Sequence, residues 1–181
     1  MKYDAVITLR DGRECRLRNG TEADGQAVLE NFKLTHEETD FLLTYPEENT
    51  FDAAKEGAYL KQKEESPNEI EIVAFVGGKV AGTAGIEAVG TRQKNKHRAE
   101  FGVAVARAFC GLGIGRALLA ACIDCAKRAG YEQLELDAVA ENGRALLMYE
   151  KAGFVEFGRN PRGFKKKDGS YQELVYLRLE L

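Results

Sequence analysis

The chain has 181 residues, of which 44% are hydrophobic and 30% are charged, which is typical of one folded domain. Its formal net charge of -3 disfavours a general nucleic-acid binder, because such proteins carry an excess of basic residues. No apolar run approaches the about 20 residues that cross a membrane, and the first residues lack a signal-peptide pattern. We therefore expect a single domain over residues 1–181 in the cytoplasm, with no nucleic-acid or membrane partner.

The first half of the chain predicts two hairpins with two helices between them. Alternating residues flank the turn at Asp11-Gly12, and a second alternating pair flanks Gly77-Gly78. Thr21, with Asp24 three residues later, is typical of a helix start, and Ser66-Pro67 ends the second helix. The predicted elements are strands over 5–9 and 13–18, helices over 21–38 and 52–65, and strands over 71–76 and 79–89.

The second half alternates between strands and helices. The clearest helix covers residues 113–129, where apolar side chains recur at three and four and Gly130 follows as a stop. We predict a loop over 90–97, a strand over 98–105, a strand over 134–138, a helix over 142–152, and strands over 154–157 and 171–181. This order predicts an α/β fold of the α+β kind, built on a mixed sheet.

Four cysteines are present, and two of them form a C-x-x-C. Cys122 and Cys125 fall inside the helical pattern, however, and the second pair or the histidines of a zinc site are missing. We therefore predict two buried free thiols on one helix face and no metal site.

A glycine-rich stretch between the strand over 98–105 and the helix over 113–129 predicts an anion site. Backbone N–H groups at a helix start are unpaired and carry a partial positive charge, and glycines let an anion approach them. A diphosphate fits such a site. The residues expected to line it are Val103, Ala104, Val105, Cys110, Gly111, Leu112, Gly113, Ile114, Gly115, Arg116 and Ala117.

Other phosphate motifs fit this stretch less well. A P-loop needs Gly-Lys-Ser/Thr, whereas Gly115 is followed by Arg116-Ala117. A dinucleotide fingerprint needs a third glycine where Arg116 or Leu118 stands. A glycine-rich turn that serves packing alone remains open at this point.

The stretch from Cys110 to Gly115 resembles the pyrophosphate loop of the GNAT superfamily of acyl-CoA-dependent N-acyltransferases, whose pattern is Q/R-x-x-G-x-G/A. Cys110 departs from the usual Gln or Arg. Residues 134–154 resemble the second signature of that family, with Asn142, Ala145 and Tyr149 before Gly153-Phe154. The resemblance implies a largely antiparallel sheet of about seven strands with about four helices, splayed at the cofactor cleft.

The resemblance also implies the activity and its residues. Acetyl-CoA would be the co-substrate, Asn142 would contact its pantetheine or phosphate arm, and Tyr149 would protonate the departing thiolate. Asn142 and Tyr149 are seven residues apart, which is two helical turns, so they share a face with the small Ala145 between them. An Asn cap and a core Tyr are the alternative interpretation of this helix.

A primary amine would attack directly in a ternary complex, after losing its proton. The family's oxyanion donor is a backbone N–H before the glycine loop, here at or near Val105. Glu100 is the candidate base, although strand alternation with Phe101 and Val103 predicts that it faces away from the cofactor. Glu87 or a water molecule are alternatives, and neither His36 nor His97 has an identifiable partner.

The resemblance places the acceptor among loops, here residues 37–45 and 90–97. Small amines, amino acids, antibiotics and protein N-termini all remain open as acceptors, and family members are often homodimers. The basic run over 165–167 is expected to be a solvated turn. A non-catalytic acyl-CoA-binding sensor and a nucleotide-dependent enzyme are the competing hypotheses.

Overall fold

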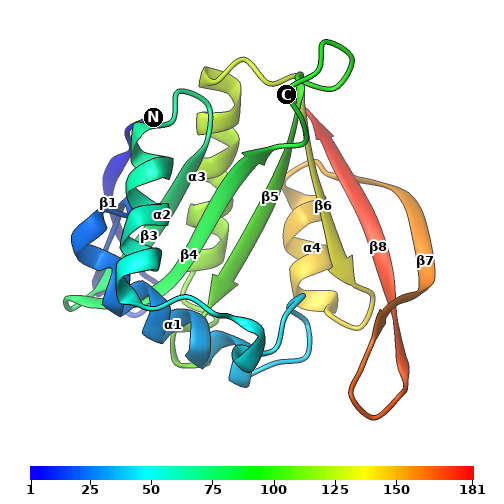
Figure 1. Cartoon of the computed structure of the whole chain (residues 1–181), viewed down its shortest axis with the longest axis horizontal. Helices are drawn as coiled ribbons and strands as arrows, with labels where there is room; N and C mark the ends of the chain where they lie inside the picture. The colour runs from blue at the N-terminus through cyan, green and yellow to red at the C-terminus, as the bar shows by residue number, and fades with distance from the viewer.

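The computed structural model, which describes residues 1–181, is an eight-stranded mixed sheet with four α-helices (Figure 1). The strand order is β1-β2-β3-β4-β5-β6-β8-β7. This confirms the predicted fold class, with one strand more than expected. The strands are β1 (Asp4–Thr8), β2 (Glu14–Asn19), β3 (Ile70–Val76), β4 (Lys79–Ala88), β5 (Arg98–Val105), β6 (Gln133–Val139), β7 (Val155–Lys165) and β8 (Tyr171–Glu180). The helices are α1 (Gly25–Glu37), α2 (Ala53–Glu65), α3 (Ile114–Arg128) and α4 (Gly143–Lys151).

The sheet has one parallel pair, β5 with β6, and this pair separates after three residues. Arg98–Glu100 pairs with Gln133–Glu135, and beyond these residues β5 pairs only with β4 and β6 only with β8. The joined end is held by His97, whose carbonyl oxygen accepts the N–H groups of Glu132 at 2.9 Å and Gln133 at 3.3 Å. The strands therefore splay toward their carboxyl ends and leave one edge of β5 without a strand partner.

The two faces of the sheet carry different helices (Figure 1). On β3, Ile72 and Ala74 belong to the large core cluster beneath α3, whereas Val73 packs on the other face with Val28 of α1 and Leu60 of α2. Because side chains alternate along a strand, one face is apolar and packs under α3 and α4. The other face, beneath α1 and α2, carries the polar side chains of β3 to β6.

The helix α3 buries the apolar stripe that the sequence predicted. Its buried residues include Cys122 and Cys125, which are free thiols in the core, as predicted. No helix of the structure is both long and apolar enough to cross a membrane.

The last hairpin is longer than the sequence suggested. β7 runs to Lys165 and pairs with β8 through Phe164↔Gln172 and Lys165↔Tyr171, so Lys165 is in a strand and not in a turn. The register is irregular between Asn160 and Phe164, which disguised the alternation in the sequence. At the N-terminal side, Thr21 and Asp24 form the predicted capping box, but a 3-10 turn precedes α1.

Candidate functional site

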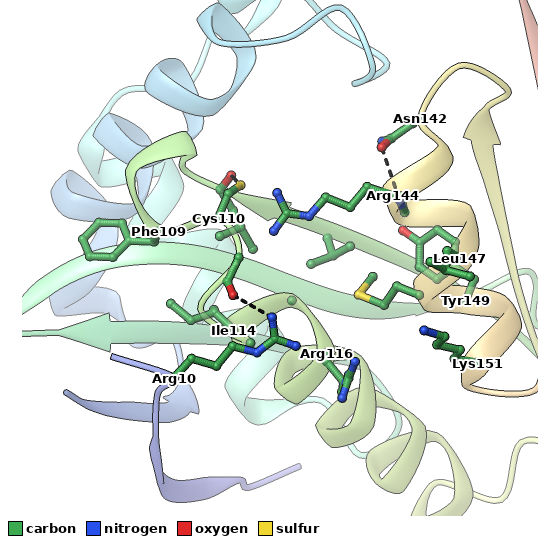
Figure 2. Close-up of a pocket in the computed structure, with 17 residues that line it drawn as sticks. Arg10, Phe109, Cys110, Ile114, Arg116, Asn142, Arg144, Leu147, Tyr149 and Lys151 are labelled. Atoms are coloured by element: carbon green, nitrogen blue, oxygen red, sulfur yellow. Dashed lines mark hydrogen bonds between the residues drawn. The ribbon is translucent and has the colours of Figure 1, made fainter. Parts of the chain in front are cut away.

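The glycine loop lies between β5 and the first turn of α3, and its backbone requires glycine. Gly111 has φ 87° and Gly113, the N-cap of α3, has φ 103°, which are left-handed conformations that side chains disfavour. Arg10, from the turn between β1 and β2, supports the loop from outside. Its Nη1 donates to the Gly111 carbonyl oxygen at 3.1 Å (Figure 2). Its backbone N–H donates to the Leu112 carbonyl oxygen at 3.2 Å.

A pocket of about 440 Å³ separates this loop from α4 (Figure 2). We call it the glycine-loop pocket. It brings together most of the residues predicted to bind the cofactor: Val103, Val105, Cys110, Gly111, Gly113, Ile114, Gly115, Arg116, Asn142, Ala145 and Tyr149. Three others do not line it. Ala104 points to the opposite face of β5, as strand alternation requires, and Leu112 and Ala117 pack against the core.

The glycine-loop pocket is lined by cations and by no acidic residue. Arg10, Arg116, Arg144 and Lys151 all contribute, and none of them forms an ion pair with a carboxylate. Arg144 reaches from α4 toward the loop (Figure 2). With the unpaired amides at the start of α3, these side chains make a site for a multiply charged anion.

Sequence reasoning missed Arg10, Phe109, Arg144, Leu147, Met148 and Lys151 in this lining. The four on α4 had a signal, because residues 144, 147, 148 and 151 follow the spacing of one helix face. Arg10 had none, since it lies about a hundred residues before the loop that it contacts.

A second cavity, of about 690 Å³, lies on the opposite face of the sheet, beneath α1 and α2. We call it the acidic cavity, because its lining includes six carboxylates and no Lys or Arg. The carboxylates are Glu48, Glu56, Glu71, Glu87, Glu100 and Asp137. The acidic cavity and the glycine-loop pocket share Val103, Asn142 and Tyr149, so they meet where β5 and β6 separate.

Only one of the two loops predicted to surround the acceptor lines the acidic cavity. Phe41 to Thr44, within the predicted range 37–45, line the acidic cavity. No residue of the range 90–97 lines this cavity. These residues connect β4 to the start of β5, where β5 and β6 are still joined, whereas the opening lies toward the end of β5.

Tyr149 is 7% exposed and lies at the junction of the two spaces. Its ring packs against Phe101, with centroids 6.2 Å apart, and against Phe154 at 5.8 Å. Burial, with the nearby charge of Asp137, raises the pKa of Tyr149 to about 12, so the phenol keeps its proton at neutral pH. Asn142 caps α4 by accepting the N–H of Ala145 at 3.3 Å, which fixes the start of this helix.

Glu100 faces the acidic cavity and not the glycine-loop pocket, as its alternation with Val103 predicted. Partial desolvation raises its pKa, and the charges of Asp137 and Glu135 add to this effect. At Glu87, burial acts to raise the pKa, but the ammonium of Lys63 and the hydroxyl of Tyr59 hold it below its ordinary value.

Neither histidine is placed for catalysis. His36 lines the acidic cavity, but its ring stacks on Phe32 with centroids 3.7 Å apart, and its Nδ1 lies 2.8 Å from the Phe32 carbonyl oxygen. Burial lowers its pKa, so the ring is neutral near pH 7. His97 serves the joined end of β5 and β6 through its backbone.

Comparison with known proteins agrees with this geometry. The model of the acetyltransferase (GNAT) family matches residues 33–154, about two thirds of the chain. The chain belongs to this acetyltransferase family. No curated protein sequence matches it.

Solved GNAT structures share the fold of this acetyltransferase. The acetyltransferase of the GNAT family from Streptococcus pneumoniae is 24% identical, with a TM-score of 0.88, over 92% of this chain and 99% of that one. A ribosomal-protein-alanine N-acetyltransferase from Brucella melitensis is 27% identical, with a TM-score of 0.80, over 91% and 99%. The candidate acetyltransferase yncA from Salmonella typhimurium, solved with its cofactor acetyl-CoA, is 23% identical, with a TM-score of 0.81, over 92% and 94%.

The carboxylate of Glu71 in the acidic cavity leads to a prediction about stability. Burial raises the pKa of Glu71 from an ordinary 4.5 to about 7. The unfolded chain therefore loses this proton at a lower pH than the native state does, and the free energy of unfolding falls as the pH rises from 4.5 through 7.

We expect Glu71→Gln to raise the free energy of unfolding by about 1–3 kcal/mol at pH 8 and by much less at pH 5. Urea unfolding at both pH values measures this. Glu65→Gln, on the exposed side of α2, is the control, and an equal gain at both pH values would contradict the assignment.

Proposed function

We propose that this protein transfers the acetyl group of acetyl-CoA to a primary amine by direct attack in a ternary complex. The observation that carries the proposal is that a cationic pocket and an acidic cavity meet at three residues, Val103, Asn142 and Tyr149. Each space suits one substrate: a polyanionic cofactor on one face and a protonated amine on the other. The relative yncA, which shares the fold, is described with acetyl-CoA as its cofactor.

The residues of the glycine-loop pocket fit coenzyme A. The amides after Gly113 and the side chains of Arg116 and Arg144 would hold its phosphates. The edge of β5 without a strand partner offers backbone groups to an extended pantetheine arm, in the manner of an added strand. The small side chain of Ala145 leaves room for this arm. When bound, acetyl-CoA supplies a reactive acetyl thioester.

On the other face, the carboxylates nearest the opening, Glu100 and Asp137, would attract the ammonium form of the acceptor, which must then lose a proton to become a nucleophile. Glu100 would accept this proton, since it faces the acidic cavity near the splayed edge and its pKa is raised above its ordinary value. Backbone N–H groups near Val105 would bind the thioester oxygen as it gains charge. Holding amine and thioester together supplies much of the acceleration.

Tyr149 would donate the proton that the departing thiolate needs. It contacts both spaces, and its raised pKa keeps the phenol protonated throughout the neutral range. The hydroxyl makes no hydrogen bond within the protein, so it is available to the sulfur atom.

The proposal is tested with purified protein by calorimetry against coenzyme A and by thiol release from acetyl-CoA with a panel of primary amines. We expect binding, together with amine-dependent thiol release. No affinity for coenzyme A would overturn the proposal. Binding without turnover on any amine would favour a non-catalytic acyl-CoA sensor instead.

The cradle is tested by Gly113→Ala. Alanine in the left-handed conformation costs about 1–2 kcal/mol, and its Cβ enters the phosphate cradle, so we expect coenzyme A affinity to fall by about tenfold or more. Gly130→Ala is the matched control, because Gly130 has φ 82°, equally open surroundings and a place at the far end of α3. Both variants should lose similar stability. If both bind coenzyme A equally well in calorimetry, the loop does not hold the phosphates.

The acid is tested by Tyr149→Phe. Removing the phenol should lower kcat about a hundredfold, because general acids contribute on that order, while coenzyme A affinity stays nearly constant. Tyr131→Phe is the control, since Tyr131 is equally buried but hydrogen-bonds to Asn68 away from both spaces. Unchanged turnover in Tyr149→Phe would assign the proton to another donor.

A further inference from the structure

Five of the six carboxylates of the acidic cavity have no cationic partner. The ion pairs of the structure include none of Glu48, Glu56, Glu71, Glu100 and Asp137, and only Glu87 is paired. The nearest ammonium group, that of Lys63, already forms two ion pairs, because it lies 2.8 Å from a Glu69 oxygen and 2.8 Å from a Glu87 oxygen. The cavity therefore holds more negative charge than one acceptor ammonium would neutralise.

Glu56 is the most telling of these groups. It is 7% exposed, lies on α2, lines the cavity, and its carboxylate makes no hydrogen bond within the protein. Buried carboxylates are almost always paired, because desolvation of an unpaired charge is costly. Burial alone raises its pKa. A carboxylate in this state is a site for a cationic group that is absent from the protein itself.

Glu71 lies beside the same space, and a glycine shapes its position. In the sheet register it faces Gly85 of β4, which in turn faces Gly102 of β5. A Cβ on Gly85 would overlap the Glu71 Oε2, and a Cβ on Gly102 would meet open space. The two glycines thus leave a trough across the sheet, from the Glu71 carboxylate on β3 to the splayed edge of β5.

We infer that the acceptor carries a second positive charge, and that Glu56 and Glu71 bind this non-reacting cation while the other amine is acetylated beside Tyr149. The inference rests on the proposed function and names its substrate class, a linear small-molecule diamine or polyamine. The Glu71 carboxylate reaches over Gly85 of β4, one to two strand spacings from the splayed edge of β5, so the two nitrogen atoms should be roughly 5–10 Å apart. The carboxylates do not converge as metal ligands would, since no group of three or more is placed to hold an ion.

The shape of the cavity favours a slender small molecule over a protein chain. Its volume of about 690 Å³ is typical of small-molecule sites. Phe41, Leu42 and Phe51 cover it from the segment between α1 and α2, and Val28 and Phe32 line it from α1. These apolar walls between two charged ends match a methylene chain with a nitrogen at each end.

The experiment compares kcat/KM, by thiol release from acetyl-CoA, for hexylamine, hexamethylenediamine, aminohexanoic acid and the eight-carbon monoamine and diamine. A hydrogen-bonded charge pair favours binding by about 1.5–3 kcal/mol, so each diamine should be preferred over its monoamine by about tenfold or more. Aminohexanoic acid should be the poorest acceptor. Added salt should weaken the diamine preference.

Two variants and a control locate the effect. In Glu56→Gln and in Glu71→Gln the diamine preference should fall toward one, through KM for the diamine, with little change for the monoamine. Glu65→Gln, exposed on the same helix and outside the cavity, should keep the full preference. Equal use of diamine and monoamine by the unaltered protein would overturn the inference and leave the proposed function intact. A lysine-containing peptide used better than every diamine would overturn the small-molecule assignment, and absence of turnover on all amines would overturn both proposals.

Discussion

The separation of β5 from β6 is the constraint on which the site depends. Hydrogen bonds to the His97 carbonyl oxygen and the ion pair of Arg98 with Glu135 join the two strands at one end. Pairing then stops after three residues, and the sheet remains continuous only through this short ladder. At the resulting opening, the glycine-loop pocket on the α3 face meets the acidic cavity on the α2 face. Tyr149, packed against Phe101, lies at this opening.

The same opening divides the charge of the protein. The formal net charge of -3 conceals a pocket whose charged residues are all Lys or Arg and a cavity whose Asp and Glu residues face no Lys or Arg in its lining. Such an arrangement opposes folding, because carboxylates are removed from water without a compensating cation, and this desolvation raises the pKa values of Glu71 and Glu56. The burial of the apolar core beneath α3 and α4 offsets this free-energy cost. Strain of this kind is typical of binding sites, where ligands restore the charge balance that the free protein lacks.

Features formed by residues close together in the sequence could be predicted from it, whereas features formed by residues far apart in the sequence could not. The glycine loop and the pair Asn142 and Tyr149 lie within short segments, so their local patterns predicted both the elements and the pocket that they share. Arg10 reaches the loop only through the packing of the first hairpin, which no local pattern encodes. The acidic cavity draws its carboxylates from a 3-10 turn, from α2 and from four strands, so it depends on sheet order and register. Residues 90–97 lie outside the acidic cavity, because they precede the end of β5 that is joined to β6.

Glu100 shows how strand alternation can refine such a prediction. Its alternation with Val103 argued against contact with the cofactor, and Glu100 lines only the acidic cavity, whereas Val103 lines both spaces. In a continuous sheet, a carboxylate on the face opposite the cofactor could not take part in the reaction. The pairing of β5 with β6 ends at Glu100, however, so the two faces of the sheet are connected from this residue to the end of β5. A base on one face could therefore accept a proton from an amine that attacks a thioester on the other face. Under the proposed function, the cofactor would bind the half built from the loop, α3 and α4, and the acceptor would bind the half built from α1, α2 and the polar sheet face. Acceptor chemistry can be set by residues such as Glu56 without disturbing the phosphate cradle.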